Sequence, residues 1–187
     1  MKRFFAIFAL FLSIPIALDA NSKPAAPAPK VLVVYFSHSG NTRVIARQIQ
    51  EAAGADIFEI VPVSPYPTAY KAVVDQAKRE LAAGYRPPLK SSGPDLSRYE
   101  TIFIGSPNWW GTVAPPVMTY LASHNFAGKR IIPFITHGGS QMGKSVGDVR
   151  KLAPGATVME GRSFLGDNVQ EAGSEVRGWM RELKLLK

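Results

Sequence analysis

The sequence predicts an α/β fold: a doubly wound parallel sheet of five strands between two layers of helices. Continuous apolar runs without polar alternation, such as residues 31–36, are typical of strands buried on both faces of a parallel sheet. Segments with helical spacing of apolar residues alternate with these runs. With the strand order 2-1-3-4-5, the loops after the first, third and fourth strands would meet at one edge, where such sheets bind ligands.

The first strand, residues 31–36, leads into a hydroxyl-rich loop and a helix in which Val44, Ile45 and Ile49 have helical spacing. A helix that starts here leaves unpaired backbone N–H groups at the positive end of its dipole, which is a general anion site. The loop residues that would complete a phosphate socket are Ser37, Ser39, Gly40, Asn41 and Thr42. The alternative is that Asn41 or Thr42 caps the helix and the serines make turn bonds.

The later elements follow from the same patterns. The expected strands are residues 56–61, 99–105, 129–136 and 157–160. The expected helices are residues 66–81, 113–124, 144–152 and 170–186. Pro115 and Pro116 are compatible with a helix only in its first turn. Helical spacing predicts that Tyr70 lies on the buried face of its helix.

Two further loops follow the third and fourth strands. In the loop predicted over residues 106–111, Trp109 and Trp110 are bracketed by Pro107, Asn108 and Gly111. Large planar side chains on a surface loop offer a stacking wall for a planar ligand, although one of the two indoles is expected to fold back over the sheet. The loop after the fourth strand begins with His137, Gly138 and Gly139.

Composition and the N-terminus predict one exported domain. The chain has 187 residues, of which 46% are hydrophobic, enough for one sizeable core. Lys2 and Arg3 precede an apolar run, so residues 1–20 are predicted to be a secretory signal peptide and the protein to be periplasmic or secreted. An uncleaved anchor is the alternative, but the run is short and interrupted, so no stable membrane span is expected after cleavage. Residues 21–30 are predicted to form a Pro/Ala-rich tether, and residues 31–187 the domain.

Charge and residue usage limit the function classes. The formal net charge of +8 favours anionic partners, but the basic residues are scattered and form no stripe, so nucleic acid binding is not expected. The chain has no cysteine and only three histidines, which are not spaced as ligands. The sequence therefore predicts neither a disulfide nor a metal site.

Three stretches resemble the flavodoxins, and among them exported bacterial flavodoxin-like proteins: residues 35–42, 105–111 and 136–140. The resemblance implies a flavodoxin-like fold with bound FMN. By position, the phosphate would be held by Ser37, Ser39, Gly40, Asn41 and Thr42. The ring system would be flanked by Pro107, Asn108, Trp109, Trp110 and Gly111, and its polar edge approached by the backbone of His137, Gly138 and Gly139. The chain departs from the family pattern at His38, where a hydroxyl residue is common, and in its positive charge.

The resemblance implies an electron-transfer protein of the cell envelope that exchanges electrons with a redox partner protein or a small quinone-like acceptor. Lys144, His137 and the general positive field would make the bound flavin less strongly reducing than in an acidic flavodoxin. One alternative is an NAD(P)H-dependent quinone or flavin reductase that uses the same FMN. Another is a module without cofactor whose same edge binds a protein.

A more distant alternative is a P-loop nucleotide-binding protein. Residues 138–145 match the pattern G-x-x-x-x-G-K-[ST] between a strand and a helix. The short chain that follows lacks an apolar strand that closes on an Asp for magnesium.

Overall fold

The computed structural model describes residues 30–187; the predicted signal peptide and residues 21–29 of the predicted tether lie outside the described residues. The strands are β1 Val31–Tyr35, β2 Asp56–Glu59, β3 Thr101–Trp109, β4 Thr112–Val113, β5 Arg130–His137, β6 Thr157–Val158 and β7 Arg162–Leu165. The main helices are α1 Asn41–Ala53, α2 Tyr70–Ala82, α3 Pro115–Ala122, α4 Ser145–Leu152 and α5 Gly173–Glu182. Within this part of the chain, no helix combines the length and the apolar character that crossing a membrane requires.

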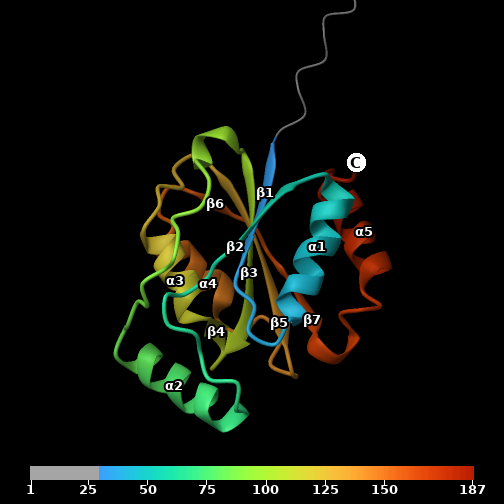
Figure 1. The fold of residues 1–187 in the computed structure, drawn as a ribbon. Helices are drawn as coiled ribbons and strands as arrows, with labels where there is room; N and C mark the ends of the chain where they lie inside the picture. The colour runs from blue at the N-terminus through green and yellow to red at the C-terminus, as the bar shows by residue number, and fades with distance from the viewer. Residues whose placement is uncertain (1–29) are drawn as a thin grey trace, which may run out of the picture.

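The sheet has the order β2-β1-β3-β5-β6, with parallel pairing along this path (Figure 1). The expected order of the five strands is therefore confirmed, but the sheet has seven strands rather than five. The two additional strands are short. β4 pairs antiparallel with the end of β3, and β7 continues the edge beside β5 where β6 stops.

The sheet is buried on both faces, as the apolar runs predict. In β1, Val31, Val33 and Tyr35 pack with α1 and α5 on one face, whereas Leu32 and Val34 belong to the core under α2, α3 and α4 on the other. Figure 1 shows α1 and α5 on one side of the sheet and α3 and α4 on the opposite side. Because α1 follows β1 onto one face and α3 follows β3 onto the other, the loops after these neighbouring strands diverge. This divergence is the switch point at which doubly wound sheets bind ligands.

Two local predictions are wrong. The segment predicted as a loop over residues 106–111 is mostly strand, because β3 runs on to Trp109 and only Trp110 and Gly111 form a turn. Tyr70 does not face the core: α2 begins at this residue, and its side chain is 82% exposed. The buried tyrosine of this region is Tyr66, which precedes the helix.

Candidate functional site

The loop between β1 and α1 keeps backbone N–H groups available for an anion. Gly40 occupies the N-cap position with φ 98°, a conformation that favours glycine, and no side chain caps the helix. The Arg43 N–H donates to Ser37 Oγ at 3.2 Å and the Val44 N–H to Gly40 O at 3.1 Å. In residues 30–187, no hydrogen bond is formed by the N–H groups of Asn41 and Thr42. The alternative in which Asn41 or Thr42 caps α1 is therefore wrong, although Ser37 does make a turn bond.

Thr42 is the buried member of this loop. Its side chain is 1% exposed, and its hydroxyl is hydrogen-bonded to the hydroxyl of Thr136 near the end of β5, with 2.8 Å between the oxygens. Thr42 can therefore offer a ligand its backbone N–H, while its hydroxyl fixes the start of α1 against β5. Ser39, at the tip of the loop, is exposed.

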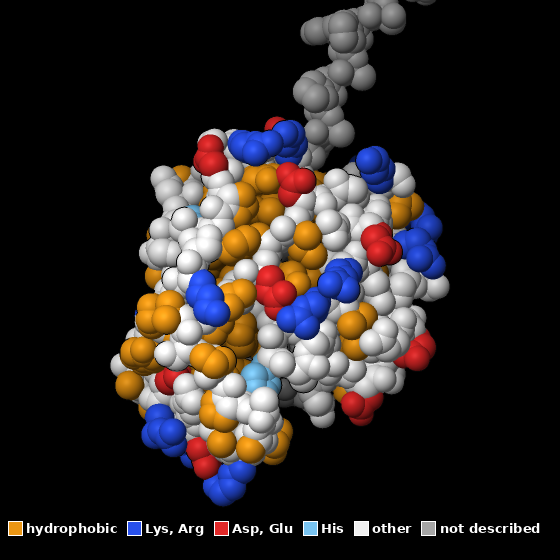
Figure 2. Space-filling view, viewed as in Figure 1, with side chains coloured by type: hydrophobic (Ala, Val, Ile, Leu, Met, Phe, Trp, Pro, Cys, Tyr) orange, Lys and Arg blue, Asp and Glu red, His pale blue; other side chains and the backbone are white. Residues whose placement is uncertain are grey.

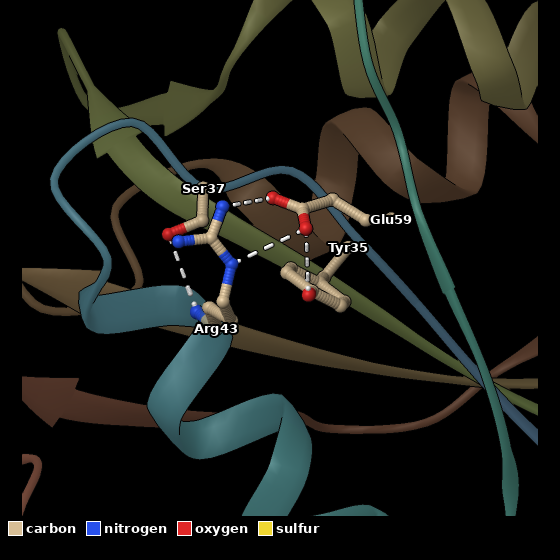
Figure 3. Close-up of polar contacts among 4 residues, drawn as sticks. All are labelled: Tyr35, Ser37, Arg43 and Glu59. Atoms are coloured by element: carbon tan, nitrogen blue, oxygen red, sulfur yellow. Dashed lines mark hydrogen bonds and ion pairs between the residues drawn. The ribbon is translucent and has the colours of Figure 1, made fainter.

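A charged network lies beside the loop (Figure 3). The Arg43 guanidinium on α1 donates to both carboxylate oxygens of Glu59 at the end of β2, at 2.5 Å and 3.2 Å. The Tyr35 hydroxyl donates to the same carboxylate at 3.0 Å. Burial raises the pKa of Tyr35, and the adjacent Glu59 carboxylate raises it further. The hydrogen bond to Glu59 likewise raises the pKa of Arg43, so its guanidinium stays charged at neutral pH.

At the end of β3, the side chains of Trp109 and Trp110 contact different parts of the fold. Trp110 and Gly111 both have positive φ, 54° and 81°, and join β3 to β4 as a two-residue turn of the primed type. Trp109 packs edge-on against Phe36 and Tyr66, with ring centroids 5.5 and 4.9 Å apart. Trp110 turns toward α2, where its Nε1–H donates to the Val74 carbonyl at 3.0 Å.

The loop after β5 is held by a hydrogen bond to the His137 side chain and by the β3–β4 hairpin. The Gly139 N–H donates to Nδ1 of His137 at 2.9 Å, so this ring nitrogen is an unprotonated acceptor. Burial lowers the pKa of His137, which disfavours a positive charge there at neutral pH. The Asn108 side chain accepts from the Gly111 N–H and donates to the Gln141 carbonyl, at 2.8 and 2.7 Å, and so ties hairpin and loop together.

The three predicted loops therefore form one rim. Thr42 and Thr136 join the first loop to β5, Asn108 joins the second to the third, and the His38 ring lies 5.9 Å from that of Trp109. His38 also bonds the Pro67 carbonyl at 2.8 Å, so it fixes the loop before α2 instead of replacing a phosphate contact. A Cβ built on each of four rim glycines meets no atom within 4 Å, so the backbone borders open space: Gly40, Gly111, Gly138 and Gly139.

Some rim residues could not be identified from the sequence. Gln141 and Glu59 reach the site from segments whose position is set only by the folded sheet. Tyr66 does carry a sequence signal, because an aromatic residue in a proline-rich loop near the predicted site could lean over the cofactor. Among residues 30–187, no three His, Asp or Glu side chains gather as a possible metal site.

The geometry argues against the P-loop alternative. In a P-loop, the turn before the helix must stand open to receive phosphate. Here the Lys144 N–H, at the start of α4, donates to the Gly111 carbonyl at 2.7 Å, and a Cβ at Gly143 would collide with the same carbonyl. The β3–β4 turn therefore fills this position. The Ser145 hydroxyl, which would bind magnesium in that motif, is fully buried.

Comparison with known proteins assigns the family. The model of the Flavodoxin family matches residues 30–183. The chain belongs to the flavodoxin family. A comparison with curated proteins gave no match.

Solved structures agree with this flavodoxin assignment. The chain is similar to two proposed flavoproteins, from Bacteroides eggerthii and Bacteroides uniformis, at 30% and 31% identity. Their TM-scores are 0.73 and 0.74, covering 83% and 82% of this chain and 98% of each of theirs. It is also similar to a flavoprotein from Lactobacillus acidophilus solved in complex with FMN, at 25% identity and TM-score 0.63, over 79% of this chain and 99% of that one. The flavodoxin-like fold predicted from the sequence is thus confirmed.

Proposed function

We propose that this flavodoxin binds FMN at the rim formed by the three loops and transfers electrons in the cell envelope. The observation that carries the proposal is that a helix N-terminus without a side-chain cap, an aromatic hairpin and a glycine pair meet at one edge of the sheet, where their glycines border open space. The similar protein from Lactobacillus acidophilus, in complex with FMN, supports the choice of cofactor.

The rim fits the parts of FMN. The N–H groups of Asn41 and Thr42, the flexible backbone of Gly40 and the exposed Ser39 hydroxyl suit a phosphate, because they supply donors at the positive end of α1. Ser37 orients this loop through the Arg43 N–H. The planar ring suits the neighbourhood of Trp109, whose own position is fixed by two aromatic contacts.

The remaining predicted residues have distinct roles in this proposal. Pro107 and Asn108 shape the hairpin, and Gly111 permits its turn. The backbone at His137, Gly138 and Gly139 would approach the polar edge of the ring, and the bond from the Gly139 N–H to His137 Nδ1 fixes the shape of this loop. Trp110 is directed toward α2, so we assign the stacking role to Trp109 and give Trp110 the role of closing the hairpin against that helix.

FMN, when bound, supplies the reversible electron transfer, and the chain binds it, orients it and limits its contact with water. The aromatic cluster of Phe36, Tyr66 and Trp109 excludes water from one side of the rim. The export signal predicted at residues 1–20 supports a periplasmic or secreted location. The partner in this proposal is a redox protein or a small quinone-like acceptor.

The test is the visible spectrum and FMN titration of the purified full chain. A yellow protein that binds FMN tightly and riboflavin much more weakly supports the proposal, because riboflavin lacks the phosphate. A colourless protein that takes up neither compound at high concentration contradicts it. If FMN binds, NADPH oxidation in the presence of a quinone distinguishes the reductase alternative, which predicts sustained turnover, from an electron carrier, which does not.

A further inference from the structure

A cavity opens between α2, the β3–β4 hairpin, α3 and α4, beside the proposed FMN site. Its volume is about 410 Å³, within the usual range for small-molecule pockets. Its lining includes no residue of the loop over residues 37–42, so it is separate from the phosphate socket. The apolar part of the lining consists of Leu81, Trp110, Met118 and Leu152.

Four basic residues surround this apolar lining: Lys78, Arg86, Lys144 and Lys151. The lining holds a single carboxylate, Asp148, which is already satisfied. It accepts from the Thr112 hydroxyl at 2.7 Å and pairs with Lys151 at 3.3 Å. In the part of the chain that the structure describes, no carboxylate pairs with Lys78, Arg86 or Lys144. The cavity therefore combines an apolar surface with uncompensated positive charge.

Trp110, the aromatic residue of the lining, is held in place by contacts within the protein. Trp110 is 51% exposed, yet its Nε1–H is bonded to the Val74 carbonyl on α2. The Lys78 ammonium lies 4.9 Å from the centroid of the indole. The positive φ of 54° at Trp110 is imposed by the hairpin turn. A side chain fixed in this way loses little conformational freedom when a ligand binds.

We propose that this cavity binds a small amphipathic anion, whose aromatic or aliphatic body lies against Trp110 and Leu152 and whose anionic group lies among the basic residues. Apolar burial would supply affinity, and the basic residues would select for charge. The net positive charge of the lining disfavours a cation of the same shape. The inference goes beyond electron transfer and does not depend on bound FMN.

The experiment uses naphthalene-2-sulfonate as the probe and the uncharged naphthalene-2-sulfonamide as its matched control, with the full chain, in the presence and absence of FMN. Binding is followed by NMR on the indole N–H of Trp110. At low salt, the sulfonate is expected to bind about tenfold more tightly than the sulfonamide, and the difference should shrink as salt screens the charges. Equal affinity of the two probes, or displacement of the sulfonate by FMN, would overturn the proposal.

Three variants locate the site. Arg86→Glu should weaken sulfonate binding about tenfold, since it reverses one exposed charge of the lining. Arg47→Glu makes the same change on α1, across the sheet, and should leave binding unchanged. Leu152→Trp should fill the cavity and weaken both probes. An equal loss of binding in the Arg86 and Arg47 variants would show a general charge effect and contradict the assignment.

Discussion

The hydroxyl oxygens of Thr42 and Thr136 lie 2.8 Å apart in the buried edge of the sheet. This hydrogen bond joins the first turn of α1 to the end of β5, so it links the predicted phosphate loop to the strand that leads into the glycine pair. Thr42 and Thr136 are 1% and 4% exposed, so neither hydroxyl can exchange its partner for bulk water. The two residues thus form a polar link between two of the three loops.

Removing one hydroxyl of this pair should cost more than removing both. Thr42→Val or Thr136→Val alone leaves a buried hydroxyl without its partner, which should lower the free energy of unfolding by about 1–3 kcal/mol. The double variant removes both polar groups and should be less destabilised than the sum of the single variants. Urea unfolding of the four proteins measures the coupling. Additive losses would show that the hydrogen bond contributes nothing to stability.

Arg43 should matter for FMN through the carboxylate that it neutralises. Arg43→Gln leaves Glu59 with a net negative charge below the phosphate loop, so FMN binding should weaken about fivefold while riboflavin binding changes little. Arg43→Gln/Glu59→Gln should restore most of the loss. Arg47→Gln removes the same charge one turn further along α1 and serves as the control. Equal weakening of FMN and riboflavin would show that the effect is structural rather than electrostatic.

The sequence could predict the central strands because each is a continuous apolar run that must be buried on both faces. It could not predict the end of β3, because Pro107, Asn108 and Gly111 are typical of loops. Pro107 is accepted in the strand where the pairing with β1 has ended, at Gly105, so its missing N–H interrupts no ladder on that side.

The error at Tyr70 has a related cause. The apolar spacing of α2 extends backward to Tyr70, but the helix starts there, so this first residue has no preceding turn to fix it over the core. Tyr66 is buried against Trp109 instead.

The positions of the site loops could be predicted from the strand order alone. The side-chain contacts that support these loops could not be predicted. Arg43 with Glu59, for example, depends on the packing of α1 against β2, which no short sequence pattern predicts.

The two indoles should differ in their contribution to stability. Trp109→Leu removes the aromatic contacts with Phe36 and Tyr66 and should lower the free energy of unfolding by about 2 kcal/mol. Trp110→Leu removes one exposed hydrogen bond and should cost about 0.5–1 kcal/mol. Urea unfolding without FMN gives both values. Equal losses would mean that the two side chains do not differ in packing as described.

Stability should fall in mild acid because of His137. Its pKa is lowered in the folded state by burial, so the unfolded chain binds the proton at higher pH than the folded chain does. The free energy of unfolding should therefore decrease as the pH falls below about 6.5, the ordinary histidine value. His137→Asn, in which Asn can still accept from the Gly139 N–H, should flatten this part of the curve. Urea unfolding between pH 8 and pH 5 tests this, and parallel curves would contradict it.

Lys144 should raise the reduction potential of the FMN-loaded protein, whereas His137 should contribute little charge near neutral pH, because its pKa is lowered. The Lys144 N–H donates to the Gly111 carbonyl in the β3–β4 turn, and Lys144 lines the same cavity as Trp110, so its side chain lies beside the hairpin that flanks the proposed ring site. A positive charge there favours the added negative charge of the reduced state. Lys144→Gln should lower the potential by on the order of 10 mV at low salt, and less at high salt. Arg47→Gln removes an equal charge on the other side of the sheet. An equal shift of the reduction potential in both variants would show that the net charge, and not the position of Lys144, sets the effect.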